Sequence, residues 1–355
     1  MMLHFKNKKI TGILSVLPTN EVAFEDEMHN YDFSPKQSLR LKSVLGFGKH
    51  RIVKGATCVS DLAIEGFSYL FKNNLLQKED LDAIILLTNT PDFIFPPTSN
   101  IIQSKLGLKK DTICLDINQG CAGFMVGLMQ AFMMLEQKSV KKVAIVTADV
   151  ISRKSSKNDR NFYPLLGDSA AITVVENGVS DDIHLFIKMD GDGSNAIIIP
   201  AGGMRIPYSA KTEIMVKDEA GNTRNQNHIF MDGTEVYNFV MHEVPPMFKE
   251  LFEIYRLTFS QVDYFMCHQP NRFMLERLAD KIHVKYDQMP NNLVENYGNS
   301  ASSTIPNIIT LNLGQSLETE SKKLCLAGFG VGLVWSSTII NVGNLKFCRK
   351  IDADL

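Results

Sequence analysis

The sequence lacks a long uninterrupted run of apolar residues. Its N-terminal stretch, MMLHFKNKKITGILSVLP, is broken by lysines and a glycine and so has no signal-peptide core. No other run reaches the roughly 18 apolar residues that a membrane-spanning helix requires. We therefore expect a cytoplasmic protein with no membrane partner.

Metal-binding and nucleotide-binding motifs are also missing. There is no HExxH, no CxxC pair and no Walker loop. The glycine run Gly328–Gly332 differs from a dinucleotide-binding loop, because Leu333 stands at the last glycine position and an apolar strand follows. The run fits a hairpin whose backbone passes close to a substrate, or a plain tight turn. We expect no metal and no cofactor.

An excess of charge of either sign is absent as well. The chain has 37 basic and 39 acidic residues, a formal net charge of −2, which provides no general attraction for nucleic acid. Its six cysteines show no spacing typical of a disulfide framework, so we expect reduced thiols. With 355 residues, 45% of them hydrophobic, the chain is long enough for two domains or a duplicated one.

Two parts of the sequence resemble each other about 180 residues apart. LQKEDLDAIILL, from Leu76, is echoed by LTFSQVDYFMCH, from Leu257, and KKVAIVTA, from Lys141, is echoed by KKLCLAGF, from Lys322. Between these pairs, KLGLKKD (105–111) matches KIHVKYD (281–287). Three matches in the same order favour an internal duplication over chance similarity between ordinary βα units.

The duplication predicts an α/β protein with two halves, residues 1–180 and residues 181–355. The repeated apolar runs are typical of strands buried on both faces, and helical stretches separate them. The polar, glycine-containing segment Ser209–His228 interrupts the second half and is expected to form an exposed lid or rim.

Cys121 is the first candidate for a reactive group. It follows the strand-like run TICLDINQG and precedes the apolar helix-like run AGFMVGLMQAFMML, so it is expected at a strand-to-helix turn. The start of a helix stabilises a thiolate, and its free N–H groups can bind the oxyanion of a thioester. A buried cysteine with no chemical role is the alternative.

His268 and Asn299 are candidates for the same site. His268 follows the strand-like run YFMC, and Asn299 stands in NYGNSASS, at the place in the second half that matches Cys121 in the first. Taken alone, each could be structural, Asn299 as a helix cap. If a two-fold axis relates the halves, the three side chains meet, and an imidazole and an amide can then hydrogen-bond to a thioester carbonyl.

Six motifs in order resemble the ketoacyl-acyl-carrier-protein synthase III family, and the resemblance spans nearly the whole chain. They are DINQGCAGF, LLGDSAA, FMDGTEVYNF, HQPNR, YGNSASSTIP and AGFGVGLVW. The resemblance implies a thiolase fold with a duplicated five-layer α-β-α-β-α arrangement, a homodimer, and an acyltransferase of fatty acid biosynthesis and lipid metabolism. The implied substrates are an acyl thioester and malonyl-acyl carrier protein, joined by decarboxylative Claisen condensation.

The resemblance also implies residue roles. Cys121 would carry the acyl group, His268 and Asn299 would stabilise the enolate, and the backbone N–H groups of Cys121 and Val331 would form the oxyanion hole. Substrate-binding positions would be Gly330 in the glycine turn, Phe95, reaching across the dimer into the partner's acyl pocket, and Arg160, stacking on the adenine of coenzyme A.

Some positions depart from the family pattern. Arg40 and Val44 stand where the family places a tryptophan and an arginine that hold coenzyme A, and Val331 replaces a glycine. These departures leave the acyl donor open and suit a specialised paralogue as well as the housekeeping enzyme. A carbon–oxygen or carbon–nitrogen acyltransferase with the same three residues, or a non-catalytic partner subunit, remains the alternative. A degradative thiolase and a hydroxymethylglutaryl synthase fit less well, because their additional catalytic residues are not in place.

Overall fold

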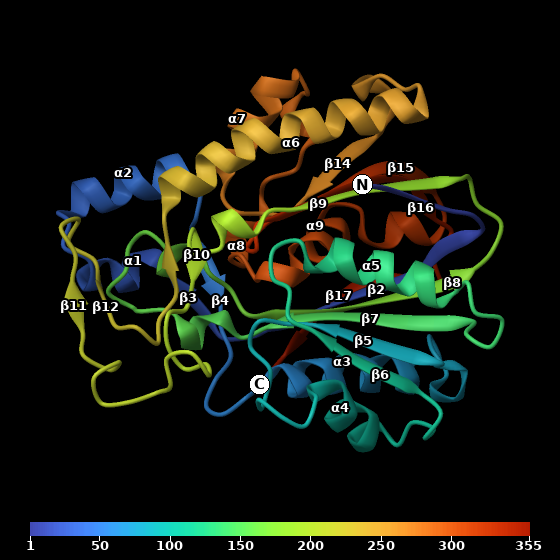
Figure 1. The fold of residues 1–355 in the computed structure, drawn as a ribbon, viewed down its shortest axis with the longest axis horizontal. Helices are drawn as coiled ribbons and strands as arrows, with labels where there is room; N and C mark the ends of the chain where they lie inside the picture. The colour runs from blue at the N-terminus through green and yellow to red at the C-terminus, as the bar shows by residue number, and fades with distance from the viewer.

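The computed structural model describes all residues from 1 to 355. Two mixed sheets lie one above the other, with helices between them and on both outer faces (Figure 1). The six-stranded sheet contains, in order, β17 (Phe347–Ala353), β2 (Lys8–Pro18), β8 (Ser169–Asn177), β7 (Lys142–Asp149), β5 (Ala83–Leu87) and β6 (Ile113–Ile117). The five-stranded sheet contains β1 (Met2–Phe5), β9 (Ile183–Met189), β16 (Val334–Gly343), β15 (Ser321–Gly330) and β14 (Tyr264–Cys267).

The helices form three layers around these sheets. Helices α3 (Val59–Lys72) and α4 (Thr98–Leu106) cover the outer face of the six-stranded sheet, and α6 (Gly233–Tyr255) and α7 (Arg272–Ile282) cover that of the five-stranded sheet. Between the sheets lie α5 (Gly123–Met134) and α9 (Thr304–Asn312). The predicted five-layer α-β-α-β-α arrangement is confirmed.

Shorter elements gather at one end of the layers. They are β3 (Glu21–Ala23), α1 (Phe24–Glu27), α2 (Pro35–Leu45), β4 (Lys49–Arg51), β10 (Ile197–Ile198), β11 (Val216–Lys217), β12 (Thr223–Arg224), β13 (Phe230–Met231) and α8 (Leu293–Asn296). None of the helices combines the length and the apolar character that a membrane crossing requires.

The sheet pairings reproduce the sequence repeat. Strand β7 pairs in parallel with β5 and antiparallel with β8, just as β15 pairs in parallel with β14 and antiparallel with β16. The matched runs KKVAIVTA and KKLCLAGF fall on β7 and β15. The internal duplication read from the sequence is therefore visible in the strand order.

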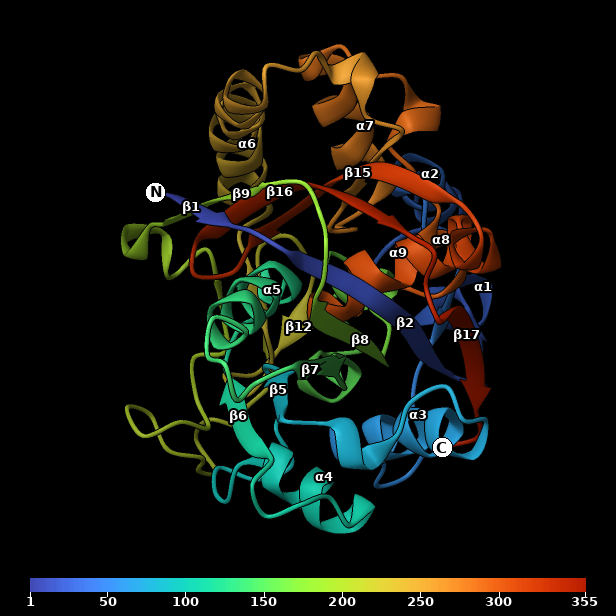
Figure 2. The same cartoon turned by 90° about the vertical axis from the view of Figure 1, so that its right-hand side faces the viewer.

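The first and last strands each join the sheet of the other half. Strand β1 pairs with β9, and β17 pairs with β2, which brings the C-terminus beside α3 (Figure 2). The division at residues 180 and 181, which falls between β8 and β9, stays a prediction.

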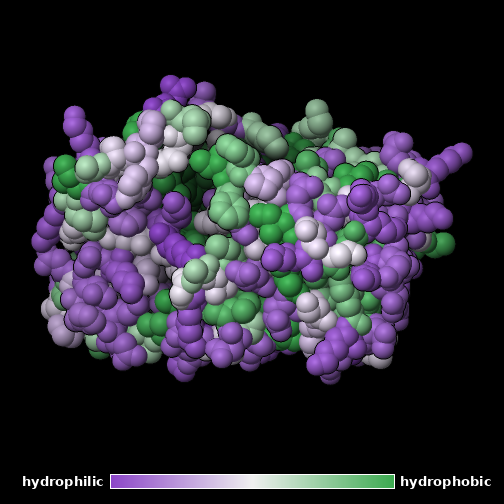
Figure 3. Space-filling model, turned by 90° about the horizontal axis from the view of Figure 1, so that it is seen from below, coloured by the Kyte–Doolittle hydropathy of each residue, from purple (hydrophilic) through white to green (hydrophobic).

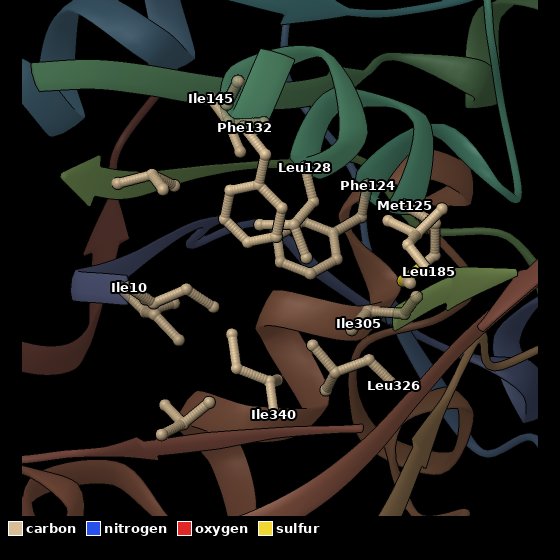
Figure 4. Close-up of a cluster of buried hydrophobic side chains, with 14 of the residues drawn as sticks. Ile10, Phe124, Met125, Leu128, Phe132, Ile145, Leu185, Ile305, Leu326 and Ile340 are labelled. Atoms are coloured by element: carbon tan, nitrogen blue, oxygen red, sulfur yellow. The ribbon is translucent and has the colours of Figure 1, made fainter. Parts of the chain in front are cut away.

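The middle layer is the most apolar part of the molecule. Helix α5 is buried on most sides because both sheets cover it, and Phe124, Leu128 and Phe132 project from it towards Ile305 and Ile340 (Figure 4). A helix enclosed in this way needs an apolar sequence all round, which is the pattern of GFMVGLMQAFMM. The packing fixes the start of α5, next to Cys121.

Candidate functional site

A cavity of about 960 Å³ opens at the end of the layers where the short elements gather. Most of its 34 lining residues are hydrophobic. The wall includes five of the predicted site residues, from both halves of the chain: Cys121, His268, Asn299, Gly330 and Val331. In Figure 3, the molecule seen from the side of α3 and α4 shows a hollow with apolar atoms among the polar surface.

Cys121 lies between β6 and α5, as the sequence predicts. The turn after β15 passes directly over its side chain: a Cβ placed on Gly330 would come within 2.5 Å of the Cys121 Cβ and 2.8 Å of its Sγ. Only glycine allows this approach. The backbone N–H groups of Val331 and Cys121 lie close enough to the sulfur to favour its thiolate form, and Gln119 Nε2 holds the turn by donating to the Val331 carbonyl at 2.9 Å.

The acidity of the Cys121 thiol differs from the expectation for a helix start. Burial raises its pKa to about 11, and the Asp149 carboxylate raises it further, while the two backbone N–H groups oppose the change. The expected lowering of the pKa is wrong for the unliganded protein, because the desolvation of the thiolate outweighs the favourable effect of the two nearby N–H groups. The thiol is therefore protonated at neutral pH.

Alkylation of Cys121 by iodoacetamide is expected to accelerate about tenfold per pH unit between roughly pH 7 and 10, because the thiolate fraction grows in that proportion below the pKa. Peptide mass spectrometry separates Cys121 from Cys58 and Cys114, which are also partly exposed. A Cys121 rate that levels off below pH 8 would contradict the raised pKa.

His268 follows β14 and is almost fully buried. Its Nδ1 lies 2.7 Å from the Thr304 hydroxyl, which itself donates to the Ala301 carbonyl at 3.1 Å. Because that hydroxyl has only one hydrogen, Nδ1 must carry the proton of a neutral ring, and Nε2 keeps a lone pair. Burial lowers the His268 pKa to about 3, although the nearby Ala301 carbonyl opposes this change, so the ring is neutral near pH 7.

Asn299 lies in a loop that runs beside the segment Leu165–Gly167 and is hydrogen-bonded to it. Its N–H donates to the Leu165 carbonyl at 2.6 Å, and its own carbonyl accepts from the Gly167 N–H at 3.0 Å. Gly298 has a positive φ of 81°, and a Cβ there would meet the Leu166 carbonyl at 2.0 Å. The motifs YGNSASS and LLGDSAA thus run side by side, joined by a parallel bridge between Leu166 and Asn299.

The orientation of the Asn299 amide follows from its neighbour. Its Oδ1 accepts from the backbone N–H of Ala301 at 3.0 Å. A backbone N–H can only donate, so the oxygen must face Ala301, and the side-chain Nδ2 is left to donate elsewhere. Since Asn299 lines the cavity, its amide can serve as a donor to a bound ligand.

Sequence reasoning missed the buried carboxyl that joins the two halves at this site. Asp149, at the end of β7, accepts from the Ser302 hydroxyl at 2.5 Å, the Ser302 N–H at 3.1 Å and the Asn89 N–H at 2.8 Å. Burial raises its pKa to about 6, and these hydrogen bonds limit the rise. The only signal in the sequence for the supporting roles of Ser302 and Thr304 is that both belong to the polar run SASST, which directly follows Asn299.

Two predicted substrate-binding residues lie outside the cavity wall. Phe95 is 82% exposed on the loop between β5 and α4. Arg160 is buried, and its guanidinium lies 4.0 Å from the centre of the Phe33 ring. No group of three or more His, Cys, Asp or Glu residues is placed to bind a metal ion.

Comparison with known families matches both halves of the chain. Residues 115–193 match the 3-oxoacyl-[acyl-carrier-protein (ACP)] synthase III family, and residues 253–342 match the family of the synthase III C-terminal part.

Individual relatives extend the similarity to the whole chain. A putative 3-oxoacyl-[acyl-carrier-protein] synthase 3 of Campylobacter jejuni is 29% identical over 97% of both chains. A beta-ketoacyl-[acyl-carrier-protein] synthase III of Caldanaerobacter subterraneus is 31% identical over 83% of this chain and 86% of its own. The crystal structure of a 3-oxoacyl-(acyl-carrier protein) synthase from Burkholderia xenovorans superposes with a TM-score of 0.91, with 29% identity and 99% of each chain covered. The chain therefore belongs to the 3-oxoacyl-[acyl-carrier-protein] synthase III family of condensing enzymes with the thiolase fold.

Proposed function

We propose that the protein condenses an acyl thioester with malonyl-acyl carrier protein, with loss of carbon dioxide, through an acyl group on Cys121. The observation that supports this most directly is the convergence of Cys121, His268, Asn299 and the Gly330–Val331 turn on one largely apolar cavity. A thiol can hold the acyl group, and the other groups can bind the two oxyanions that the reaction forms.

In the first half-reaction, Cys121 attacks the carbonyl carbon of the acyl donor. The Nε2 lone pair of His268 accepts the thiol proton as the sulfur attacks the carbonyl carbon. The carbonyl oxygen accepts from the backbone N–H groups of Cys121 and Val331, which lie near the sulfur. The carbon–sulfur bond of the donor then breaks, and His268 returns the proton to the departing thiolate.

In the second half-reaction, malonyl thioester loses carbon dioxide and becomes an enolate. The negative charge that develops on the thioester oxygen favours protonation of His268, which takes up a proton from solvent and then presents Nε2–H beside the Asn299 amide. Both groups donate to the enolate oxygen while its carbon attacks the acyl group on Cys121. The released Cys121 thiolate recovers the proton from His268, so one proton is consumed per turnover.

The dimer and the acyl donor belong to the same proposal. We infer a homodimer because Phe93, Ile94 and Phe95 are largely exposed beside β6, which is an edge strand, and a second copy could cover them. Phe95 would then reach the partner's cavity. The acyl donor can be a coenzyme A or a carrier-protein thioester, because the positions that would hold coenzyme A differ from the family pattern. Arg40 and Val44 stand on α2 in place of the family's tryptophan and arginine, and the Phe33 ring already covers one face of the Arg160 guanidinium.

No cofactor takes part in these steps, because protein groups supply the nucleophile, the proton carrier and the oxyanion donors. The six free cysteines suit the reducing environment of the cytoplasm, where we place the enzyme.

The test combines two measurements on the full-length protein. Intact-protein mass spectrometry with acyl-coenzyme A and acyl-carrier-protein donors is expected to reveal an acyl adduct on Cys121. Subsequent addition of malonyl-acyl carrier protein should remove the adduct and release one carbon dioxide per 3-oxoacyl product. Transfer of the acyl group to an alcohol or amine without carbon dioxide release would instead establish the alternative acyltransferase.

Replacing Gly330 with alanine is expected to slow acylation of Cys121 by about 100-fold or more, because the new methyl group would overlap the thiol and displace the Val331 N–H. The rate of adduct formation measures the effect. Gly203→Ala is the matched control, since Gly203 also lines the cavity but a Cβ there meets no atom within 4 Å. Equal rates for the two variants would contradict the proposed oxyanion site.

A further inference from the structure

The cavity wall carries one unpaired positive charge. With His268 neutral, Lys154 is the only charged side chain among the 34 lining residues, and none of them is Asp or Glu. The acidic residues of the neighbouring segment, Asp159 and Asp218, form ion pairs with Arg224 instead. The Lys154 ammonium forms no ion pair within the chain, so it remains free to bind an anion.

Lys154 stands beside an apolar part of the wall. It ends the 3₁₀-helix η3 (Ile151–Lys154), and its carbonyl accepts from the Ile229 N–H at 2.7 Å. Ile151 and Ile229 also line the cavity and pack together with Leu166. The charge of Lys154 adds to burial in lowering the pKa of His228, the residue before Ile229. Lys154 is itself exposed, so its ammonium stands on the solvent side of the apolar wall.

An ammonium in this position favours ligands that carry an anion. Attraction between opposite charges is stronger beside a low-dielectric wall than in water, and a charged hydrogen bond adds to it. The malonyl carboxylate is a poor match, because holding it in an ion pair would stabilise the group that must leave as carbon dioxide. A carboxylate at the far end of the acyl chain is free of that conflict.

We propose that Lys154 binds the terminal carboxylate of the acyl group, so that the preferred acyl donors are half-thioesters of dicarboxylic acids. This inference rests on the proposed function, in which Cys121 accepts the acyl group. It assigns Lys154 to substrate selection and gives it no part in bond formation.

The test measures acylation rates of Cys121 with succinyl-, glutaryl- and adipyl-coenzyme A, each against an unsubstituted acyl-coenzyme A of matched length. The wild type should favour at least one carboxylated donor by about tenfold or more. Lys154→Met should lower the ratio of carboxylated to unsubstituted rates by at least about tenfold, and Lys154→Arg should retain most of it. Lys157→Met, a neighbouring exposed lysine outside the cavity wall, should leave the ratio unchanged.

Repeating the measurement with N-acetylcysteamine thioesters, which have no phosphate, shows whether Lys154 binds the acyl carboxylate or a phosphate of coenzyme A. The Lys154→Met effect should persist with these donors; an effect seen only with coenzyme A thioesters would assign Lys154 to a phosphate and overturn the proposal. Cys121 adducts that form with equal preference in wild type and Lys154→Met would also overturn it while leaving the proposed function intact. No adduct from any donor would reject both.

Discussion

Replacing Cys121 with alanine is expected to abolish the acyl adduct and to reduce condensation by at least about 10⁴-fold. The cavity offers no second thiol in its place, since Cys121 is the only cysteine in its wall. Cys121→Ser should fail almost as completely, because a hydroxyl is far more difficult to ionise than a thiol in the same desolvated position. Intact-protein mass spectrometry and product release measure the two effects.

The same variant separates the two half-reactions. Cys121→Ala retains His268 and Asn299, so it should still decarboxylate malonyl thioester, without forming a carbon–carbon bond. Cys58→Ala is the matched control, because Cys58 is also a free, partly exposed cysteine but lies outside the cavity wall. A Cys121→Ala protein that still forms adducts, with the label on another residue, would reject Cys121 as the nucleophile.

The parts of the fold that the sequence predicts are those determined by local patterns. The buried runs KKVAIVTA and KKLCLAGF have strand character by themselves, and their repetition predicts two matching sheets. The strand-to-helix turn at Cys121 follows in the same way. The exchange of β1 and β17 between the sheets has no local pattern, because pairing partners far apart in the chain are chosen by tertiary packing.

The convergence of the three residues on one cavity could be expected from the sequence, but their electrostatics could not. The repeat matches Cys121 with Asn299, and His268 follows a strand, which is enough to expect the three near one another, although Asn299 follows the short helix α8 and not a strand. The pKa of the thiol depends on how much water its neighbours exclude, and that is a property of packing. The proton position on His268 depends likewise on Thr304, a residue that the sequence does not distinguish from an ordinary helix start.

Replacing Asn299 with alanine is expected to leave acylation within about tenfold of the wild-type rate, while decarboxylation falls about 10²- to 10³-fold. The first step uses the thiol, His268 and the backbone N–H groups, whereas the second depends on the free Asn299 amide. Asn299→Asp retains an oxygen that can accept from the Ala301 N–H, but it replaces the side-chain NH₂ donor with a second acceptor oxygen. Its decarboxylation rate should therefore fall as far as that of Asn299→Ala. Carbon dioxide release from malonyl-acyl carrier protein measures the step.

His268→Ala tests whether His268 is the group that accepts the proton of the Cys121 thiol. If Nε2 accepts the thiol proton and later donates to the enolate, as we propose, this variant should lose both acylation and decarboxylation, in contrast to Asn299→Ala. Asn296→Ala, a nearby exposed asparagine that bonds only to the Asn292 carbonyl, should affect neither step. If Asn299→Ala condenses at the wild-type rate, enolate stabilisation must come from another group. If His268→Ala acylates normally, the thiol loses its proton to solvent, and His268 acts only in the second step.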